Sequence, residues 1–217
     1  LRLLFTKEAQ ASYISHLDTM RTFQRVFPRA ELHLKHSNGF HPHPIISIVL
    51  PLPVGQSSDC ELLDFETVEE TDGAGIAEKL NTGLPAGLRV RECYPVTRPV
   101  REFTFLRARL ELLYDNGVPA GTADALRALF ARETLMIEKR TKHKELAQID
   151  IAPLIREMTL TEQDGSILAD AVVAAQNPGL NPAYLAQAIE RELPSLKPDF
   201  VRVRRTEIYD TEGNVFR

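Results

Sequence analysis

Hydrophobic and polar positions in the first hundred residues follow strand-like and helix-like spacings in turn. Apolar runs and alternations predict strands at residues 2–7, 45–50, 60–67 and 88–94, with a short further strand around Leu32 and Leu34. Helical spacing predicts one helix that ends before Pro28 and a second helix at residues 75–82. The resulting order, β-α-β-β-α-β, is the ferredoxin-like pattern.

The first of these helices has a clear start signal. Ser15 is a favourable N-cap residue, and Asp18 places a carboxylate in the first turn. Apolar residues, among them Phe23 and Phe27, then recur at helical spacing. Cations spaced by four residues form one stripe of the same helix: Arg21, Arg25 and Arg29.

A similar order begins again after a linker at residues 95–99, which contains two prolines. The patterns predict helices at 122–131 and 182–192 and strands at 103–114, 135–139, 150–160, 167–175 and 200–209. We therefore expect an α+β protein made of two tandem ferredoxin-like (βαββαβ) units. Residues 1–95 form the first unit and carry the histidine-rich loop, whereas residues 96–217 form the second and carry a basic segment.

Composition excludes several classes of protein. Cys60 and Cys93 are the two cysteines, and they form no Cys-x-x-Cys pair, which argues against a cysteine-only zinc site, an iron–sulfur cluster or a disulfide framework. We expect no cofactor. No apolar run approaches the roughly 20 residues that cross a bilayer, and a signal-peptide pattern is missing, so the expected location is cytoplasmic.

The net charge of -4 conceals a local asymmetry. Residues 1–50 carry six Lys/Arg against three Asp/Glu, whereas residues 51–82 carry one against eight. Because local patches determine the field that a ligand meets, the acidic total does not exclude an anionic partner.

Histidines are concentrated early in the chain, with five of the six between positions 16 and 43. The candidate acid/base residues are His16, Asp18 and His41, because imidazole titrates near neutral pH. A zinc site made from two of the histidines with Asp18 is an alternative. Prolines 42 and 44 stiffen the backbone beside His41 and His43, and His-x-His is a weaker metal signal than two histidines four apart on a helix, so we predict no metal site.

A second candidate chemistry is phosphate binding, for which arginine and lysine are suited. In an RNA complex, Phe40 and His43 in the loop would contact a base, and the cations would contact phosphates: Arg21, Arg25, Lys139, Arg140, Lys142 and Lys144. A simpler interpretation of these charges is a solvated surface, and Phe40 could equally fold back onto the core.

Several motifs together resemble the uncharacterised radical-SAM-linked domain family. They are Ser15-His16-Leu17-Asp18 with Arg21 and Arg25, the loop from Gly39 to Pro44, Leu52-Pro53-Val54-Gly55 with Ser57, Glu61 and Asp64, and Arg140-Thr141-Lys142 leading to Asp150-Ile151. The resemblance implies a partner, a B12-binding-type radical SAM protein, and a link to RNA or ribosome metabolism. The chain has no Cys-x-x-x-Cys-x-x-Cys motif of its own, and His41 stands where family members commonly have Asn.

Three functional hypotheses follow. The first is an accessory module, without catalysis of its own, that associates with a radical SAM protein and binds RNA or a ribonucleoprotein. The second is an RNA-processing or RNA-modifying enzyme that uses His16, Asp18 and His41. The third is a protein–protein scaffold whose acidic segment, residues 59–72 with Glu66, Glu69 and Glu70, docks a basic partner.

Overall fold

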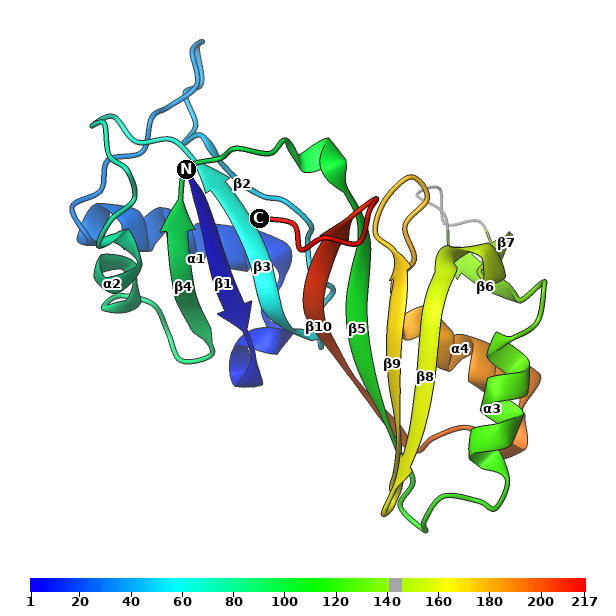
Figure 1. Cartoon of the computed structure of the whole chain (residues 1–217). Helices are drawn as coiled ribbons and strands as arrows, with labels where there is room; N and C mark the ends of the chain where they lie inside the picture. The colour runs from blue at the N-terminus through cyan, green and yellow to red at the C-terminus, as the bar shows by residue number, and fades with distance from the viewer. Residues whose placement is uncertain (141–145) are drawn as a thin grey trace. The chain divides into compact units, whose positions relative to one another are not determined.

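A computed structural model of the chain describes residues 1–140 and 146–217 (Figure 1). Backbone contacts divide it into two compact units: unit 1 is Leu1–Glu102 with Arg217, and unit 2 is Phe103–Phe216. The sequence placed the division at residue 95, ahead of the short 3-10 helix η2 (Val100–Glu102). Among the described residues, no helix is long and apolar enough to cross a membrane.

Unit 1 contains a four-stranded antiparallel sheet with strand order β4-β1-β3-β2. Its elements are β1 (Arg2–Lys7), the 3-10 helix η1 (Ala9–Tyr13), α1 (His16–Arg29), β2 (Ile46–Ile48), β3 (Ser57–Phe65), α2 (Ile76–Asn81) and β4 (Leu88–Tyr94). This is the β-α-β-β-α-β order with the first and third strands at the centre.

The core of unit 1 lies between the sheet and its two helices. Alternate residues of β1, Leu3 and Phe5, point into it, where the Phe5 ring meets the Phe23 ring of α1 edge-on with centroids 4.9 Å apart. The rings of Phe27 and Phe65 lie 4.8 Å apart. Aromatic side chains at helical spacing on α1 therefore attach that helix to both central strands.

The start of α1 is capped as the sequence predicts. The Ser15 Oγ accepts a hydrogen bond from the Asp18 backbone N–H at 3.1 Å, and the Ser15 hydroxyl donates to the Asp18 carboxylate at 2.7 Å. Arg21 Nη1 lies 3.0 Å from the same carboxylate. The bond from the Ser15 hydroxyl and then the Arg21 guanidinium lower the pKa of Asp18 from its ordinary value of 3.8.

Unit 2 repeats the topology with an insertion. Its elements are β5 (Phe103–Leu113), α3 (Thr122–Phe130), β6 (Met136–Arg140), β7 (Leu146–Asp150), η3 (Ala152–Leu154), β8 (Ile155–Gln163), β9 (Ser166–Ala174), α4 (Ala183–Glu192), η4 (Pro194–Leu196) and β10 (Phe200–Asp210). Strands pair in the order β10-β5-β9-β8, while β6 and β7 form a separate hairpin between α3 and β8.

The predicted fold class, α+β with two tandem ferredoxin-like units, is confirmed by these strand orders.

Some local predictions are wrong. Leu34 forms an isolated bridge to Thr67 rather than part of a strand. Helix α1 continues through Pro28 to Arg29, because a proline in the last turn removes one hydrogen bond without ending the helix there. The strand expected at 150–160 is interrupted by η3, which contains Pro153.

The two central strands of unit 1 are also joined by a buried ion pair. Arg2 of β1 is completely buried, and its Nε and Nη2 lie 2.6 and 2.9 Å from the two carboxylate oxygens of Asp64 on β3. The Arg2 Nη1 also donates to the Arg98 carbonyl at 3.3 Å. Two parallel bonds to one carboxylate fix both side chains in a single geometry.

We expect Asp64→Asn to destabilise the protein, because it leaves a buried guanidinium without its carboxylate. The expected loss in free energy of unfolding is about 3 kcal/mol, measured by chemical denaturation followed by circular dichroism. The control is Glu66→Gln, whose exposed pair with Lys35 spans 3.5 Å and should contribute less than about 1 kcal/mol. Equal losses in the two variants would contradict this assignment.

We expect Asp18→Asn to lower the melting temperature slightly at neutral pH. A lowered carboxyl pKa means that the folded state favours the ionised form, so the stabilisation is present above pH 3.8 and is lost as the pH falls through the lower, folded-state pKa. The difference between wild type and variant should therefore vanish in strongly acidic solution. The control is Asp124→Asn. It breaks a similar pair, with Arg127, but the N-cap residue of this helix is Gly121, which makes no side-chain hydrogen bond to the carboxylate. A difference that persists at low pH would oppose the linkage.

Candidate functional site

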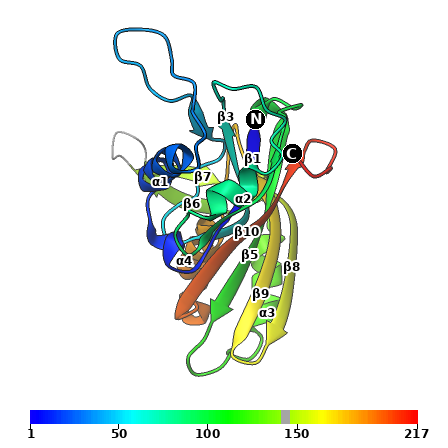
Figure 2. The same ribbon diagram turned by 90° about the vertical axis from the view of Figure 1, so that its left-hand side faces the viewer.

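The most prominent surface feature of unit 1 is a projecting loop, residues 33–45, which we call the histidine loop (Figure 2). A short backbone ladder holds its base: Lys35 N–H donates to the Glu66 carbonyl, and Ile45 N–H donates to the Lys35 carbonyl, both at 2.8 Å. One step further out, Ser37 N–H donates to the His43 carbonyl at 2.8 Å. Gly39 has a φ of +129°, which side-chain-bearing residues rarely adopt, and this allows the turn at the tip.

Three imidazoles of the loop have one ring nitrogen already bound. Nδ1 of His33 lies 3.0 Å from Glu69 Oε1, Nδ1 of His36 lies 3.1 Å from the Leu34 carbonyl, and Nδ1 of His43 lies 2.9 Å from Ser37 Oγ. These contacts fix the ring orientations and leave Nε2 available to solvent or a ligand. Within residues 1–140 and 146–217, no group of three or more His, Cys, Asp or Glu is arranged to hold a metal ion.

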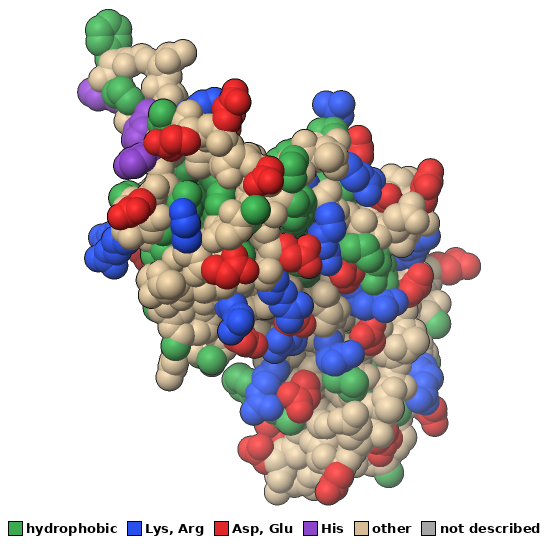
Figure 3. All heavy atoms as spheres, turned by 60° about the vertical axis from the view of Figure 1, so that its left-hand side comes forward, with side chains coloured by type: hydrophobic (Ala, Val, Ile, Leu, Met, Phe, Trp, Pro, Cys, Tyr) green, Lys and Arg blue, Asp and Glu red, His purple; other side chains and the backbone are tan. Residues whose placement is uncertain are grey.

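The Phe40 ring at the tip is fully exposed, at 102% of its reference area. The alternative in which this ring folds back onto the core is therefore wrong. Burial of a phenylalanine side chain contributes about 1.5–3 kcal/mol of favourable free energy, and the free protein lacks this contribution at Phe40. Figure 3 shows the histidines gathered on this loop with a hydrophobic side chain at its end.

The histidine loop also lies in a long stretch without carboxylates. No Asp or Glu occurs between Glu31 and Asp59, a stretch that contains Lys35 and four histidines. Helix α1 leads into the loop, and its Arg25 and Arg29 are exposed. Arg21, in contrast, is partly neutralised by Asp18. The loop and the end of α1 thus form a surface to which cations and imidazoles contribute.

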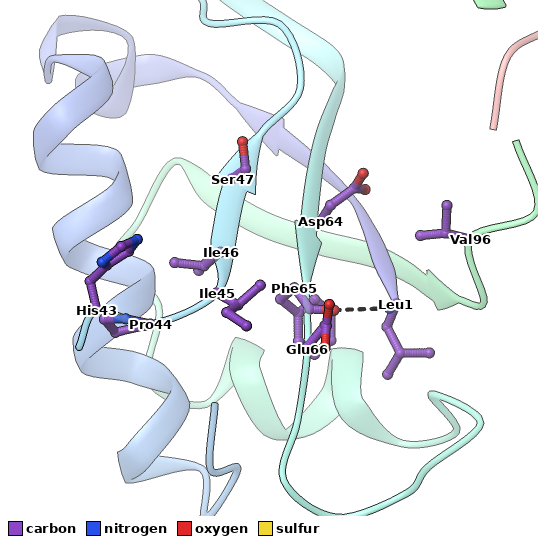
Figure 4. Close-up of a pocket in the computed structure, with 10 residues that line it drawn as sticks. All are labelled: Leu1, His43, Pro44, Ile45, Ile46, Ser47, Asp64, Phe65, Glu66 and Val96. Carbon is purple, nitrogen blue, oxygen red and sulfur yellow. Dashed lines mark hydrogen bonds between the residues drawn. The ribbon is translucent and has the colours of Figure 1, made fainter. Parts of the chain in front are cut away.

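A pocket of about 490 Å³ lies at the base of the loop (Figure 4). Its floor is apolar, with Ile45, Ile46 and Phe65, and its polar rim includes His43 and Glu66. Asp64 also lines it, but this carboxylate is held by Arg2. The volume is within the range of small-molecule sites, and the mixed lining would suit a flat ring with polar edges.

The candidate acid/base residues do not form one site. His16 is the first residue of α1, close to Ile14, whose carbonyl accepts a hydrogen bond from Lys7 Nζ at the end of β1. His41 belongs to the histidine loop, whose base is hydrogen-bonded to Glu66 just beyond the opposite end of the sheet. A 14-residue helix is about 21 Å long, so the length of α1 separates the two histidines.

Of the two candidates at the start of α1, neither has the partners of an acid/base pair. Nδ1 of His16 is buried and has no hydrogen-bond partner in the described part of the chain. The Asp18 carboxylate binds Ser15 and Arg21 and has a lowered pKa. The Ser15 to Asp18 motif is therefore explained by the capping of α1.

The predicted basic segment belongs to unit 2. Lys139 lies on β6, with its Nζ 6.0 Å from the centre of the Tyr184 ring on α4, and Arg140 is the last residue of β6. Lys142 and Lys144 lie outside the described residues. Arg21, Arg25, Phe40 and His43, in contrast, belong to unit 1. The candidate RNA-binding residues are thus divided between the two units.

Sequence reasoning missed a group of arginines on the sheet of unit 2, among them Arg107 and Arg109 on β5. The signal was available, because charged residues alternate there with the buried Leu106, Ala108 and Leu110. On β10, Arg202 is exposed and pairs with Glu111 at 2.9 Å, whereas Arg205 is buried.

Comparison with solved structures shows the fold. A chain of "Crystal Structure of a Cbf5-Nop10-Gar1 Complex" is similar over 95% of this chain and 48% of that one, with 10% identity and a TM-score of 0.51. This chain therefore spans about half the length of that protein. A second match is "Crystal Structure of an Unknown Protein from Galdieria sulphuraria". It covers 94% of this chain and 97% of that one at 11% identity, but its TM-score of 0.25 is too low to indicate a shared fold.

Comparison with protein families gives a match, whereas no curated protein matches the chain. Residues 1–182 match the family described as "Uncharacterized protein conserved in bacteria (DUF2344)". That match includes residues 1–102 of unit 1 and most of unit 2. The chain belongs to this bacterial family.

Proposed function

We propose that this chain is an RNA-binding module without catalysis of its own. The observation that carries the proposal is the fully exposed Phe40 ring at the end of the histidine loop, in a stretch free of carboxylates. An exposed aromatic ring offers a stacking surface to an unpaired base, and stacking does not depend on base identity. Other apolar partners would also cover the ring, but they would not make use of the neighbouring cations.

The cations near the loop supply the second part of the proposal. Arg25 and Arg29 are exposed on α1, whereas Lys35 at the base of the loop is paired with Glu66. Guanidinium groups bind phosphate oxygens in a fork geometry, and each phosphate that they neutralise releases counterions. RNA satisfies both features, because bases would contact Phe40 while the backbone follows the end of α1.

The alternative of an RNA-processing enzyme finds less support. It requires His16, Asp18 and His41 to act on one substrate atom, and acid/base groups must come within about 3 Å of that atom. The length of α1 between the two histidines favours a binding role. His43 fits binding as well, because its bond to Ser37 holds the ring beside the pocket.

A partner protein is the third part of the proposal. The motif resemblance supports association with a B12-binding-type radical SAM protein. An open acidic hollow of about 830 Å³, lined by Glu66, Glu69, Glu70 and Asp72 together with Lys35, offers a surface for a basic partner. Glu66 is paired with Lys35, and the Glu69 carboxylate lies 3.0 Å from His33 Nδ1, which leaves Glu70 and Asp72 as the more available charges.

RNA binding is tested by filter binding of a labelled 20-nucleotide uridine RNA over a series of salt concentrations. Phe40→Ala should weaken binding about 5- to 150-fold at every salt concentration, since a stacked base is worth about 1–3 kcal/mol. The double variant Arg25→Ala/Arg29→Ala should lower the slope of log affinity against log salt by about 1.4, because each lost contact with a single strand removes about 0.7.

Matched controls lie on the same unit. Tyr13→Ala removes an exposed aromatic ring beyond the other end of α1, and Arg89→Ala/Arg91→Ala removes two exposed cations from β4. These controls should leave the affinity and the salt slope unchanged. Wild-type affinity that does not weaken as salt rises would sink the proposal.

The partner is tested by co-purification of the full chain with the radical SAM protein encoded in the same genome. Charge reversal at Glu66, Glu69 and Glu70 should abolish recovery if the acidic hollow is the docking surface, whereas Arg89→Ala/Arg91→Ala should not. Unchanged recovery with the reversed charges would argue against this surface, and no recovery with wild type would argue against the partner.

A further inference from the structure

The sheet of unit 2 has one covered face and one open face. On β5, Leu106, Ala108 and Leu110 are at most 3% exposed, and they alternate with the accessible Arg107 and Arg109. Alternation along a strand places these two sets on opposite faces. Figure 1 views unit 2 with α4 behind the sheet. The arginines therefore lie on the face away from the core.

An aromatic pair lies on the open face. Phe105 of β5 is directly opposite Tyr209 of β10, and both alternate with the buried neighbours Leu106 and Ile208. A guanidinium accompanies each ring: Arg156 lies 4.6 Å from the Phe105 centroid, and Arg107 lies 5.8 Å from the Tyr209 centroid. Two adjacent, partly buried rings, each with a planar cation over it, form a surface on which further flat groups can stack.

The arginines of this face are only partly neutralised. Asp170 is shared, since it lies 3.3 Å from Arg107 and 3.7 Å from Arg109. Surface ion pairs of this length contribute little, so Asp170 leaves both guanidiniums able to bind a further anion. The Arg107 Nε is a buried donor without a well-directed hydrogen bond among the described residues. Glu157 is 3.5 Å from Arg107, which is a long contact for an exposed pair.

From this geometry we infer that the open face of unit 2 is a second binding surface, specific for single-stranded nucleic acid. Bases stack on Phe105 and Tyr209, and phosphates contact Arg107 and Arg109 beside them. A duplex keeps its bases in its own stack, so only a single strand uses both features. A four-stranded antiparallel sheet with helices on one face and aromatic rings on the other is also the arrangement of RNA-recognition motifs.

This inference rests on the proposed function for the kind of polymer, but it assigns different residues on a different unit. The test uses the full chain, with the 20-nucleotide uridine RNA as the single strand and a 20-base-pair RNA as the duplex. Phe105→Leu/Tyr209→Leu keeps apolar bulk and removes both rings. It should weaken single-strand binding about 5- to 150-fold and leave duplex binding unchanged.

A second variant tests the same surface independently, in case the first variant does not fold. Arg107→Gln/Arg109→Gln should lower the salt slope for the single strand by about 1.4. The controls lie on the helix side of the same unit. Phe130→Leu alters an aromatic residue of α3, and Arg132→Gln removes a half-exposed guanidinium that pairs with Glu192. Both controls should bind the two RNAs as wild type does.

Crosslinking locates the contact directly and separates the two proposals. Photo-crosslinking of a 4-thiouridine RNA, mapped by mass spectrometry, should place adducts on the strands that contain Phe105 and Tyr209. Adducts confined to the histidine loop, with normal binding by both sheet variants, would overturn the inference and leave the proposed function intact. Loss of binding in the sheet variants but not in Phe40→Ala would do the reverse. Wild type that binds neither RNA would overturn both.

Discussion

Each unit depends on the constraint that both of its helices cross on one side of its sheet. Crossovers between parallel strands are right-handed, so the two helices of a β-α-β-β-α-β unit pack side by side on the same face. In unit 2 the buried Leu106, Ala108 and Leu110 of β5 point to that side, and Arg107 and Arg109 alternate with them on the other. Charged and aromatic side chains can collect on such a face without disturbing the core, and Arg107 and Tyr209 do so.

Unit 1 also has both helices on one side of its sheet, but its accessible side chains are arranged differently. Its helix side is sealed by aromatic contacts, of which Phe5 with Phe23 is one, whereas Arg2 and Asp64 join the central strands through a buried bidentate pair. The accessible chemistry of this unit lies in a connection, the histidine loop between α1 and β2, rather than on a face of the sheet. Loops that stand on a rigid scaffold commonly carry function, because they vary without altering the core.

The sequence predicted the architecture well wherever a pattern extended over several turns or a whole strand. Ser15 with the apolar residues after it gave the start of α1, and alternation from Phe103 onwards gave β5. Short or interrupted patterns failed. Residues 146–150 alternate weakly and were not predicted as β7, and the Pro153 signal for a break before β8 was overlooked.

The candidate sites were harder to predict because they depend on pairing that a sequence does not contain. Proximity in sequence grouped His16 with His41, yet α1 separates them. The pairing of Phe105 with Tyr209 joins residues about a hundred positions apart, through a register that includes a bulge. The sequence did not determine whether Phe40 is exposed, since a loop phenylalanine can face either the core or the solvent.

The prolines of the histidine loop have a kinetic consequence. Pro42 and Pro44 restrict the backbone on one side of the tip, and the ladder through Ser37 and Lys35 fastens the base, so part of the loop is ordered before it meets a ligand. This ordered part surrenders little conformational entropy on association. Complex formation should therefore be governed by diffusion and long-range attraction, with no slow rearrangement, and differences in affinity between ligands should appear mainly as differences in residence time.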